Sequence, residues 1–318
     1  MTSPAPLCII AGPTLAAYNF GPNHPFGDQR YPAFMAALKA CGLVGKVRIC
    51  EPAEADDTTL GLFHTPELIS HVRKHSITGA GYLDYGDTPA FRGVFAAAAT
   101  VVGATLKAVD RVMAGECRRA FVPIAGLHHA RPDRVAGFCV FNDCAIAIEH
   151  LRRQHGIRRI AYVDIDAHHA DGVFYGYEDD PDLLYVDFHQ DGRTLYPGTG
   201  SLDETGTGAG AGLKMNIPMP PGSGDALFMK LWPAAERFLN KHRPEFILLE
   251  CGADSLAGDP LTHLGYTAAV HGHVARRLSA LADECCAGRL VAMGGGGYHL
   301  DNINAAWLAV LEGMLAET

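Results

Sequence analysis

The sequence of 318 residues contains no apolar run of 18 residues and no run of basic residues. The first absence excludes a membrane-spanning helix, and the second, with a net charge of −9, argues against nucleic acid as a main partner. The 36 glycines follow no Gly-x-y period, which excludes collagen. A composition that is 48% hydrophobic and only 19% charged is typical of a folded, soluble chain, not of a disordered one.

Cysteine pairs at C-x-x-C spacing are also missing, although the chain has nine cysteines. The first residues, Met1–Leu7, lack the charged start of a signal peptide. We therefore expect reduced, mostly buried thiols and a cytoplasmic protein, with no membrane partner.

Short apolar runs alternate with longer helical patterns along the whole chain. The runs predict strands at Leu7–Ile10, Val47–Cys50, Phe121–Ile124, Arg159–Asp166, Leu183–Phe188, Leu213–Ile217, Phe246–Cys251 and Leu290–Met293. The helical patterns lie at Tyr31–Cys41, Pro66–His75, Phe91–Met113, Asn142–Gln154, Asp225–His242, Tyr266–Cys286 and Asn302–Leu315, with Asp225 and Thr267 as expected N-caps. Strands that are apolar throughout are buried on both faces, as in a parallel sheet covered by helices. The prediction is one α/β domain, residues 1–318, with a mostly parallel sheet of about eight strands and ligands beyond the carboxyl ends of its strands.

Histidine is plentiful, at 16 residues, and several histidines follow predicted strands. Directly after Arg159–Asp166 comes Ala167-His168-His169-Ala170-Asp171. Asp164 and Asp166 flank a buried isoleucine and would repel each other without a cation. Asp166 and His168 are two residues apart, so in an extended segment they point the same way and can share one metal ion. Asp254, after Phe246–Cys251, would complete an Asp/His/Asp set with an open position for water, as catalytic zinc requires.

Two further motifs follow neighbouring strands. His128 and His129 come after Phe121–Ile124, and two imidazoles beside an activated water suit general acid and base work. Gly294–Gly297 comes after Leu290–Met293 and would let the backbone approach a ligand closely. Tyr298 then supplies a phenol donor.

These four motifs, in this order, resemble the histone deacetylase superfamily, which includes bacterial acetoin-utilisation-type proteins and acetylpolyamine amidohydrolases. The resemblance runs from about Gly21 to Trp307 and includes Gly137–Asp143 and Tyr196–Gly200. It implies the three-layer arginase–deacetylase α/β fold.

The resemblance also implies a role for each matching residue. Asp166, His168 and Asp254 would bind Zn2+, with Fe2+ as another metal that the same ligands accept. The catalytic group would be the pair His128 and His129, their supporting carboxylates Asp164 and Asp171, and Tyr298, which would bond the substrate carbonyl. Substrate would be bound by Asp87 at the rim and by Gly137, Phe138, Tyr196 and Leu261. A structural K+ would lie near Asp164, Asp187 and Phe188, and the loop with His24 and Arg30 would back the pocket.

Four positions depart from the usual pattern of that superfamily: Ala170, Tyr196, Asp187 and the pair Pro123–Ile124. None of them removes a catalytic group, so we expect an active enzyme. Asp259 is expected to orient the loop after Asp254. Histidines that lie on helical patterns are expected to be surface or hydrogen-bonded residues: His71, His75, His150, His155, His242, His271 and His273.

The predicted function is a zinc amidohydrolase that removes acetyl or short acyl groups from lysine side chains by attack of activated water. Deacetylation of a small amine, such as an acetylpolyamine, is the alternative. The absence of an obvious large insertion favours the lysine substrate. A manganese ureohydrolase of the same fold is disfavoured by His128–His129 and Gly294–Tyr298, and a non-catalytic acyl-lysine reader by the complete ligand set. An oligomer remains open.

Overall fold

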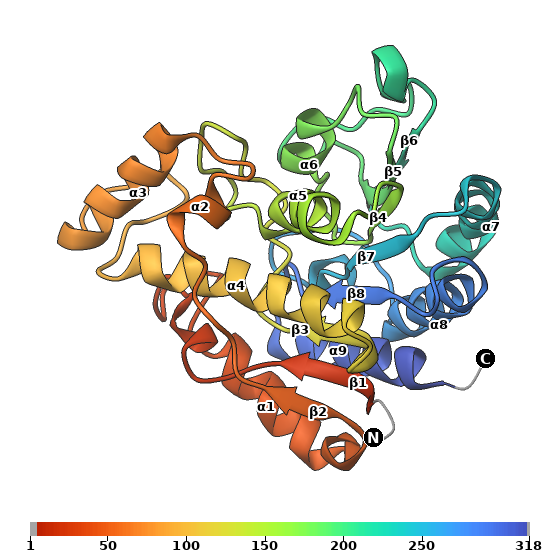
Figure 1. The fold of residues 1–318 in the computed structure, drawn as a ribbon, viewed down its shortest axis with the longest axis horizontal. Coiled ribbons are helices and arrows are strands. Elements are labelled where there is room, and N and C mark those ends of the chain that lie inside the picture. The colour runs from red at the N-terminus through yellow and green to blue at the C-terminus, as the bar shows by residue number, and fades with distance from the viewer. Residues whose placement is uncertain (1–4, 317–318) are drawn as a thin grey trace.

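The computed structural model describes residues 5–316 (Figure 1). Residues 1–4, which hold most of the segment used to judge a signal peptide, lie outside the described residues. Within the described part, the chain folds around one eight-stranded sheet in the order β2-β1-β3-β8-β7-β4-β5-β6. Its strands are β1 (Ala5–Ile10), β2 (Arg48–Cys50), β3 (Cys117–Val122), β4 (Ile160–Asp164), β5 (Leu183–Gln190), β6 (Lys214–Met219), β7 (Phe246–Glu250) and β8 (Leu290–Met293).

Every pairing in this sheet is parallel, so the predicted α/β fold is confirmed and the sheet is more uniform than the mostly parallel one expected. The strand predicted at Phe121–Ile124 is displaced, because β3 begins at Cys117. Arg118 and Arg119 interrupt the apolar run, so the first residues of β3 did not match the pattern of a buried strand. Arg119 is buried in β3, where its guanidinium group is paired with Asp283.

The α-helices of the described chain fall where helical patterns were expected, with two additions. They are α1 (Arg30–Ala40), α2 (Asp57–Leu60), α3 (Pro66–Thr78), α4 (Val94–Met113), α5 (Asp143–His155), α6 (Asp171–Gly176), α7 (Asp225–His242), α8 (Ala268–Cys285) and α9 (Leu300–Leu315). Short 3-10 helices lie at Leu15–Ala17, Leu43–Lys46, Gly208–Gly210 and Ala253–Ser255. The helices α2 and α6 were not predicted, because so few residues leave no periodic pattern to detect.

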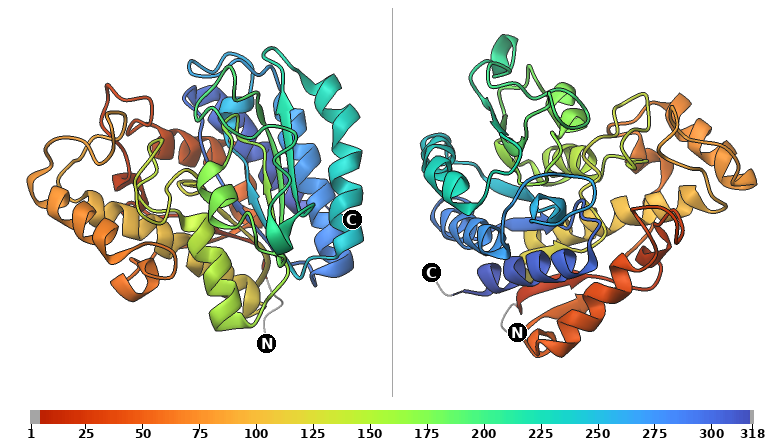
Figure 2. Two further views of the ribbon diagram at one scale, coloured as in Figure 1. Left: turned by 90° about the horizontal axis from the view of Figure 1, so that it is seen from above. Right: turned by 180° about the vertical axis from the view of Figure 1, so that it is seen from behind.

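Helices cover both faces of the sheet (Figure 2). On one face α4 packs against α5 and against strands β1 and β3. On the other, α1 contacts α9, α9 contacts α8, and α8 contacts α7. None of the helices within residues 5–316 combines the length and the apolar character that crossing a bilayer demands.

The N-termini of α7 and α8 meet through one carboxylate. Thr267 caps α8 as predicted, because its hydroxyl oxygen accepts a hydrogen bond from the N–H of Ala269. Asp225 is not the cap of α7: it is the first helical residue, and Gly224 occupies the cap position. The carboxylate of Asp225 instead accepts bonds from the backbone N–H of Thr267 (2.7 Å) and from its hydroxyl (2.6 Å).

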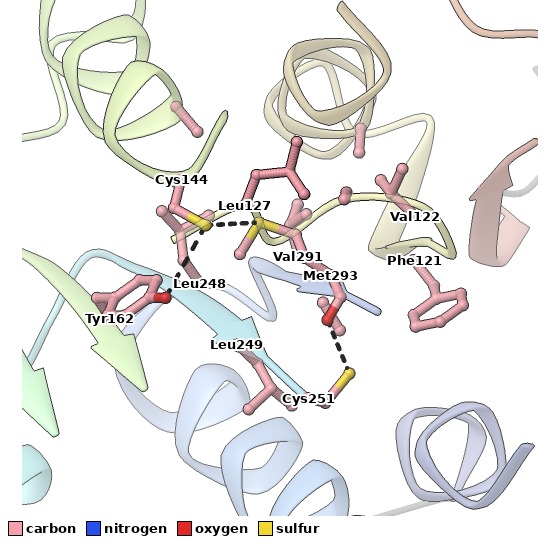
Figure 3. Close-up of a cluster of buried hydrophobic side chains, with 14 of the residues drawn as sticks. Phe121, Val122, Leu127, Cys144, Tyr162, Leu248, Leu249, Cys251, Val291 and Met293 are labelled. Atoms are coloured by element: carbon pink, nitrogen blue, oxygen red, sulfur yellow. Dashed lines mark hydrogen bonds between the residues drawn. The ribbon is translucent and has the colours of Figure 1, made fainter. Parts of the chain in front are cut away.

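The core between the sheet and α5 is apolar and contains several thiols (Figure 3). Met293 at the end of β8 lies at its centre, with its sulfur 3.8 Å from Sγ of Cys144 and its carbonyl accepting from the thiol of Cys251. All nine cysteines lie within the described residues and none forms a disulfide, as predicted. Most are buried, although Cys41 is exposed.

Candidate active site

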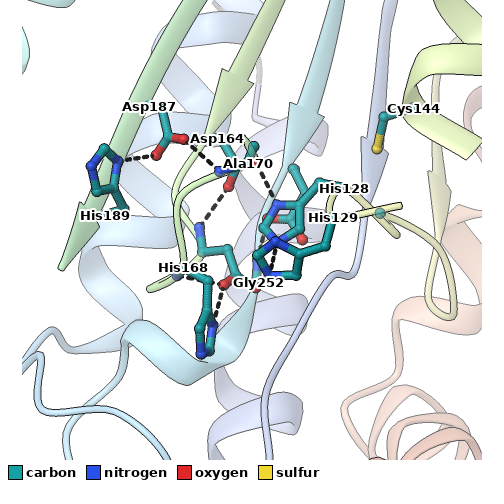
Figure 4. Close-up of polar contacts among 12 residues, drawn as sticks. His128, His129, Cys144, Asp164, His168, Ala170, Asp187, His189 and Gly252 are labelled. Carbon is teal, nitrogen blue, oxygen red and sulfur yellow. Dashed lines mark hydrogen bonds and ion pairs between the residues drawn. The ribbon is translucent and has the colours of Figure 1, made fainter. Parts of the chain in front are cut away.

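The four motifs meet because the strands that carry them are neighbours in the sheet. Strands β3, β8, β7 and β4 are adjacent in that order, and all end at the same edge since the sheet is parallel. The loops that follow them bring His128, His129 and His168 together (Figure 4). Asp254 and Tyr298 lie at the same place, since Oδ2 of Asp254 is 3.1 Å from Nδ1 of His168 and Tyr298 lines the same cavity. This is the carboxyl edge at which parallel α/β sheets bind ligands.

Asp166, His168 and Asp254 form a compact, buried cluster. Nδ1 of His168 lies 3.0 Å from Oδ1 of Asp166 and 3.1 Å from Oδ2 of Asp254, and one ligand atom from each residue falls within 4.8 Å of the others. The backbone fixes both carboxylates, because the N–H of Gly296 donates to Oδ2 of Asp166 and the N–H of Ala167 donates to Oδ1 of Asp254.

The charges in this cluster suit a divalent cation. Burial and the neighbouring Asp166 raise the pKa of Asp254 to about 7, so the two carboxylates resist being ionised together. Burial alone would lower the pKa of His168, but its hydrogen bonds to both carboxylates outweigh it and raise the pKa to about 10. Two buried carboxylates and one imidazole are a ligand set that zinc accepts, and a cation there would relieve the repulsion between them.

Beside the cluster, His128 and His129 form a supported pair. Their Nε2 atoms lie 3.1 Å apart. Nδ1 of His128 is 2.9 Å from Oδ2 of Asp164, and Nδ1 of His129 is 2.7 Å from Oδ1 of Asp171. Each carboxylate accepts the Nδ1 proton of its imidazole, which leaves both Nε2 atoms directed at the shared cavity.

The two imidazoles differ in basicity. Burial would lower the pKa of His128, but the adjacent Asp164 carboxylate outweighs it and raises the pKa to about 9. Burial and the positive charge of His128 lower the pKa of His129 to about 4. A cation bound at His168 would add positive charge near both rings and lower both pKa values. The environments therefore separate an acid from a base within one pair, which is the usual arrangement for general acid–base work.

Three residues that sequence reasoning left without a role hold this pair in place. Asn142 donates through Nδ2 to the carbonyls of His128 (3.2 Å) and Ala130 (2.9 Å). The carboxylate of Asp143 accepts from the N–H groups of Gly126 and Leu127. Arg131 donates to Oδ2 of Asp171 at 2.7 Å, on the opposite side from His129. The only signal in the sequence for these supporting bonds was the polar pair Asn142–Asp143 at the start of a predicted helix.

The glycine loop after β8 lies against the cluster of Asp166, His168 and Asp254. A Cβ atom on Gly296 would stand 2.3 Å from Oδ2 of Asp254 and 2.6 Å from Oδ2 of Asp166, so only glycine fits. The guanidinium group of Arg30, which is buried, donates to the carbonyls of Gly295 (2.6 Å) and Gly297 (3.0 Å). The expectation that the N-terminal loop backs the pocket has its physical basis in these two bonds.

Tyr298 is oriented through its backbone, because its N–H donates to Oδ2 of Asp259 at 2.9 Å. The same carboxylate group accepts from the N–H of Leu261, so Asp259 orients the loop as expected. The ring of Tyr298 lies across from Phe138, with centroids 6.0 Å apart. Tyr298, Phe138, both histidines of the pair and His168 all line one small cavity of about 20 Å³.

The entrance to this cavity is built from aromatic rings. Phe138 and Tyr196 both approach the imidazole pair, and the ring of Tyr196 packs edge-on against His129 at 5.1 Å. Gly137 has φ +55°, and a Cβ there would lie 2.5 Å from the His129 ring. A hollow of about 550 Å³ opens outside, lined by Asp84, Tyr85, Asp87, Arg131, Arg134 and Tyr196. Asp87 is exposed at this rim, whereas Leu261 is only partly exposed.

Two of the departures from the usual motif also have a structural setting. Ala170 has φ −73°, which any residue adopts, and its N–H donates to Oδ2 of Asp187. Oδ1 of Asp187 pairs with Nδ1 of His189 at 2.8 Å, and Tyr185 donates a further bond to Oδ2. The Asp187 carboxylate therefore accepts bonds from Ala170, Tyr185 and His189, and so ties the metal-loop backbone to β5.

Glu250, the last residue of β7, is a buried acid that sequence reasoning also missed. Its Oε2 accepts from the N–H of Gly252, whereas Oε1 has no partner among the described residues. Burial and the carboxylates of Asp164 and Asp166 raise the pKa of Glu250 well above its usual range. Glu250 is visible in the sequence as the one charged residue of the predicted strand Phe246–Cys251, but the sequence assigned it no role because its neighbours Asp164 and Asp166 are distant in sequence.

Comparison with known proteins gives a consistent result. A model of the histone deacetylase domain matches residues 24–314. The chain is 37% identical to the acetoin utilization protein AcuC of Bacillus subtilis over 303 residues, covering 92% of this chain and 77% of the relative. It is 38% identical over 284 residues to a probable deacetylase of Archaeoglobus fulgidus, covering 88% of this chain and 78% of that protein.

Similarity extends to plants and to a solved structure. Histone deacetylase 14 of Arabidopsis thaliana, a chloroplastic protein, is 33% identical over 317 residues, covering 93% of this chain and 74% of the relative. The crystal structure of the HDA15 HD domain superposes with a TM-score of 0.90 at 26% sequence identity, covering 99% of this chain and 90% of that one.

Proposed function

Because the chain belongs to the histone deacetylase family, we propose that it is a zinc-dependent amidohydrolase that removes acetyl or short acyl groups from lysine side chains. The observation that carries the proposal is the meeting of an Asp/His/Asp ligand set with a carboxylate-supported imidazole pair in one cavity. The match of the family model to residues 24–314 supports treating the whole chain as one catalytic domain.

In this proposal Asp166, His168 and Asp254 hold the metal ion, which is Zn2+ or, with the same ligands, Fe2+. Bound there, it would lower the pKa of water and polarise the amide carbonyl. A structural K+ near Asp164 belongs to the same proposal. All remaining steps fall to side chains of this chain.

His129 acts as the general base, since its lowered pKa keeps Nε2 unprotonated. It takes a proton from water as the water oxygen attacks the amide carbon. Asp171 holds the Nδ1 proton and so keeps the ring in the required tautomer. His128, whose pKa is raised by Asp164, protonates the leaving amine nitrogen as the C–N bond breaks. The hydroxyl of Tyr298 donates to the developing oxyanion.

The rim supports a lysine side chain as the substrate. Phe138 and Tyr196 suit the apolar stem of an acyl-lysine, and the hollow outside them is large enough to hold flanking peptide residues. That hollow carries charges of both signs, since Asp84, Asp87, Arg131 and Arg134 all line it. Its two arginines would repel a small cationic polyamine, which favours a peptide substrate.

A substrate panel tests the proposal. Purified protein is assayed with acetyl-lysine peptides, longer acyl-lysine peptides, acetylpolyamines and acetylated small metabolites, with and without a metal chelator. We expect turnover of an acyl-lysine peptide that is lost on chelation and regained with Zn2+. Turnover confined to acetylpolyamines would replace the substrate assignment, and activity unaffected by complete metal removal would overturn the mechanism.

A further inference from the structure

A second cluster of metal-ligating side chains lies outside the active site, where α4 and α5 end. Nε2 of His150 is 2.7 Å from Oδ1 of Asp110, and Nε2 of His155 is 2.8 Å from the same oxygen atom. The ligand atoms of the three residues all lie within 4.8 Å of one another, as do those of Asp166, His168 and Asp254. We propose that Asp110, His150 and His155 form a second site for a zinc-class divalent cation.

The donor set and its geometry suit such an ion. Two imidazole nitrogens and one carboxylate are ligands that zinc, nickel and copper accept, and a surface site can complete its coordination with water. Both imidazoles turn the same nitrogen, Nε2, towards one point, although they come from different turns of α5. The two rings are inclined at 73°, with centroids 5.3 Å apart, so that neither stacks over the other.

The surroundings leave the carboxylate available to a cation. Other carboxylates near the end of α5 are paired with arginine, as Glu149 is with Arg153 and Asp180 with Arg152. Among residues 5–316, Asp110 forms ion pairs only with the two histidines, and no lysine or arginine reaches it. A negative charge that faces two potential ligands, and no fixed positive charge, favours capture of a cation from solution.

The helix ends add to this attraction. Asp110 lies in the last turn of α4, and His155 is the last residue of α5. The carboxyl ends of two helices therefore converge on the same point, and each carries a partial negative charge that stabilises a nearby cation. The side chains are 14% (His150), 22% (His155) and 52% (Asp110) exposed, so an ion can enter from solvent without opening the fold.

An ion at this position would tie α4 to α5. The start of α5 carries Asn142 and Asp143, which hold the loop of the imidazole pair, so the site lies at the opposite end of the helix that supports the catalytic loop. Because only the folded chain brings the three ligands together, bound ion adds to the stability of the folded state by mass action.

Counting zinc tests the inference. The full chain is stripped with a chelator and dialysed against buffered Zn2+, and bound zinc is measured by elemental analysis. We expect the His150→Gln/His155→Gln variant and, separately, Asp110→Asn to bind one ion fewer than wild type. His242→Gln, which removes an imidazole from the last turn of α7, is the matched control and should bind as many as wild type.

The difference of one zinc ion per chain between wild type and these variants reports on the Asp110 site alone, because the variants leave Asp166, His168 and Asp254 unchanged. As a second readout, Zn2+ should raise the Tm of wild type and His242→Gln by more than that of Asp110→Asn. An unchanged zinc count and an unchanged zinc-dependent rise in Tm in the double variant would overturn the proposal.

Discussion

At the scale of single residues, the candidate active site gives two neighbouring histidines different acidities. His128 and His129 are adjacent in sequence and both are buried, yet their pKa values move in opposite directions. The cause lies in their surroundings. The carboxylate of Asp164 outweighs the burial of His128, whereas burial and the positive charge of His128 outweigh the Asp171 carboxylate at His129. The proposed division of labour between acid and base therefore depends on each ring's own balance of burial and charge.

Tyr298→Phe removes one hydroxyl from the cavity. We expect kcat to fall at least about a hundredfold, because a donor to the developing oxyanion is lost, while the fold is retained. The measurement is steady-state turnover of the best substrate from the panel, with circular dichroism as the test of folding. Tyr196→Phe is the matched control: its hydroxyl is at the entrance, so the loss should stay below about tenfold. Near-normal turnover by Tyr298→Phe would remove Tyr298 from the mechanism.

Much of the site was visible in the sequence because its residues directly follow apolar strands. Asp164–Asp171, Asp254 and Tyr298 all lie just beyond such runs, and a parallel sheet brings these ends together. The residues that support these side chains could not be predicted from their position after a strand. Arg131 and Glu250 act on partners distant in sequence, Asp171 for Arg131 and Asp164 and Asp166 for Glu250, and single-sequence patterns do not contain that information.

At the scale of elements, the helix ends depend on contacts between helices as well as on their own caps. Aspartate is a residue type that often caps helices, but Gly224 caps α7 and the carboxylate of Asp225 instead accepts two hydrogen bonds from Thr267, the N-cap of α8. Local sequence does not distinguish these two uses of an aspartate. The local sequence still predicted α7 and α8 correctly, because the apolar periodicity of a long helix does not depend on which residue caps it.

Asp225→Ala should lower the free energy of unfolding by about 1–2 kcal/mol, because two hydrogen bonds between the ends of α7 and α8 are lost. Asp225→Asn retains an acceptor and a polar partner for Thr267 and should lose less than half as much. Urea unfolding followed by circular dichroism measures both, and kcat should be unchanged since the bonds of Asp225 go to Thr267 and to no candidate site residue. Equal stability of the Ala variant and wild type would show that the contact contributes nothing.

At the scale of the whole molecule, buried imidazoles make the fold sensitive to acid. Burial lowers the pKa of His64 and of His271 to about 4, and each ring is bonded to backbone groups. In the unfolded chain these groups titrate near 6.5. As the pH falls from about 6.5 towards 4, the unfolded chain takes up protons at these two rings that the folded chain cannot, so the stability that these two rings contribute decreases over that interval.

His64→Gln should therefore remove one acid-sensitive contribution to stability. The free energy of unfolding of wild type, relative to that of His64→Gln, should fall by about 1 kcal/mol between pH 7.5 and pH 5.5. Urea titrations at the two pH values, with the same metal content in both proteins, measure the difference. Parallel pH profiles for variant and wild type would contradict this account of His64.

The strand order has a consequence for how the protein is made. Strands β2-β1-β3 and β4-β5-β6 are complete once residue 219 has been synthesised, but they are not neighbours until β7 and β8, from Phe246 onwards, enter between them. Before Phe246 is synthesised, the inner edges of β3 and β4 have no partner strand, and we expect such unpaired edges to favour aggregation. Asp254 and Tyr298 arrive on the same late segment. Closure of the sheet and assembly of the candidate site thus depend on the same segment, residues 246–298.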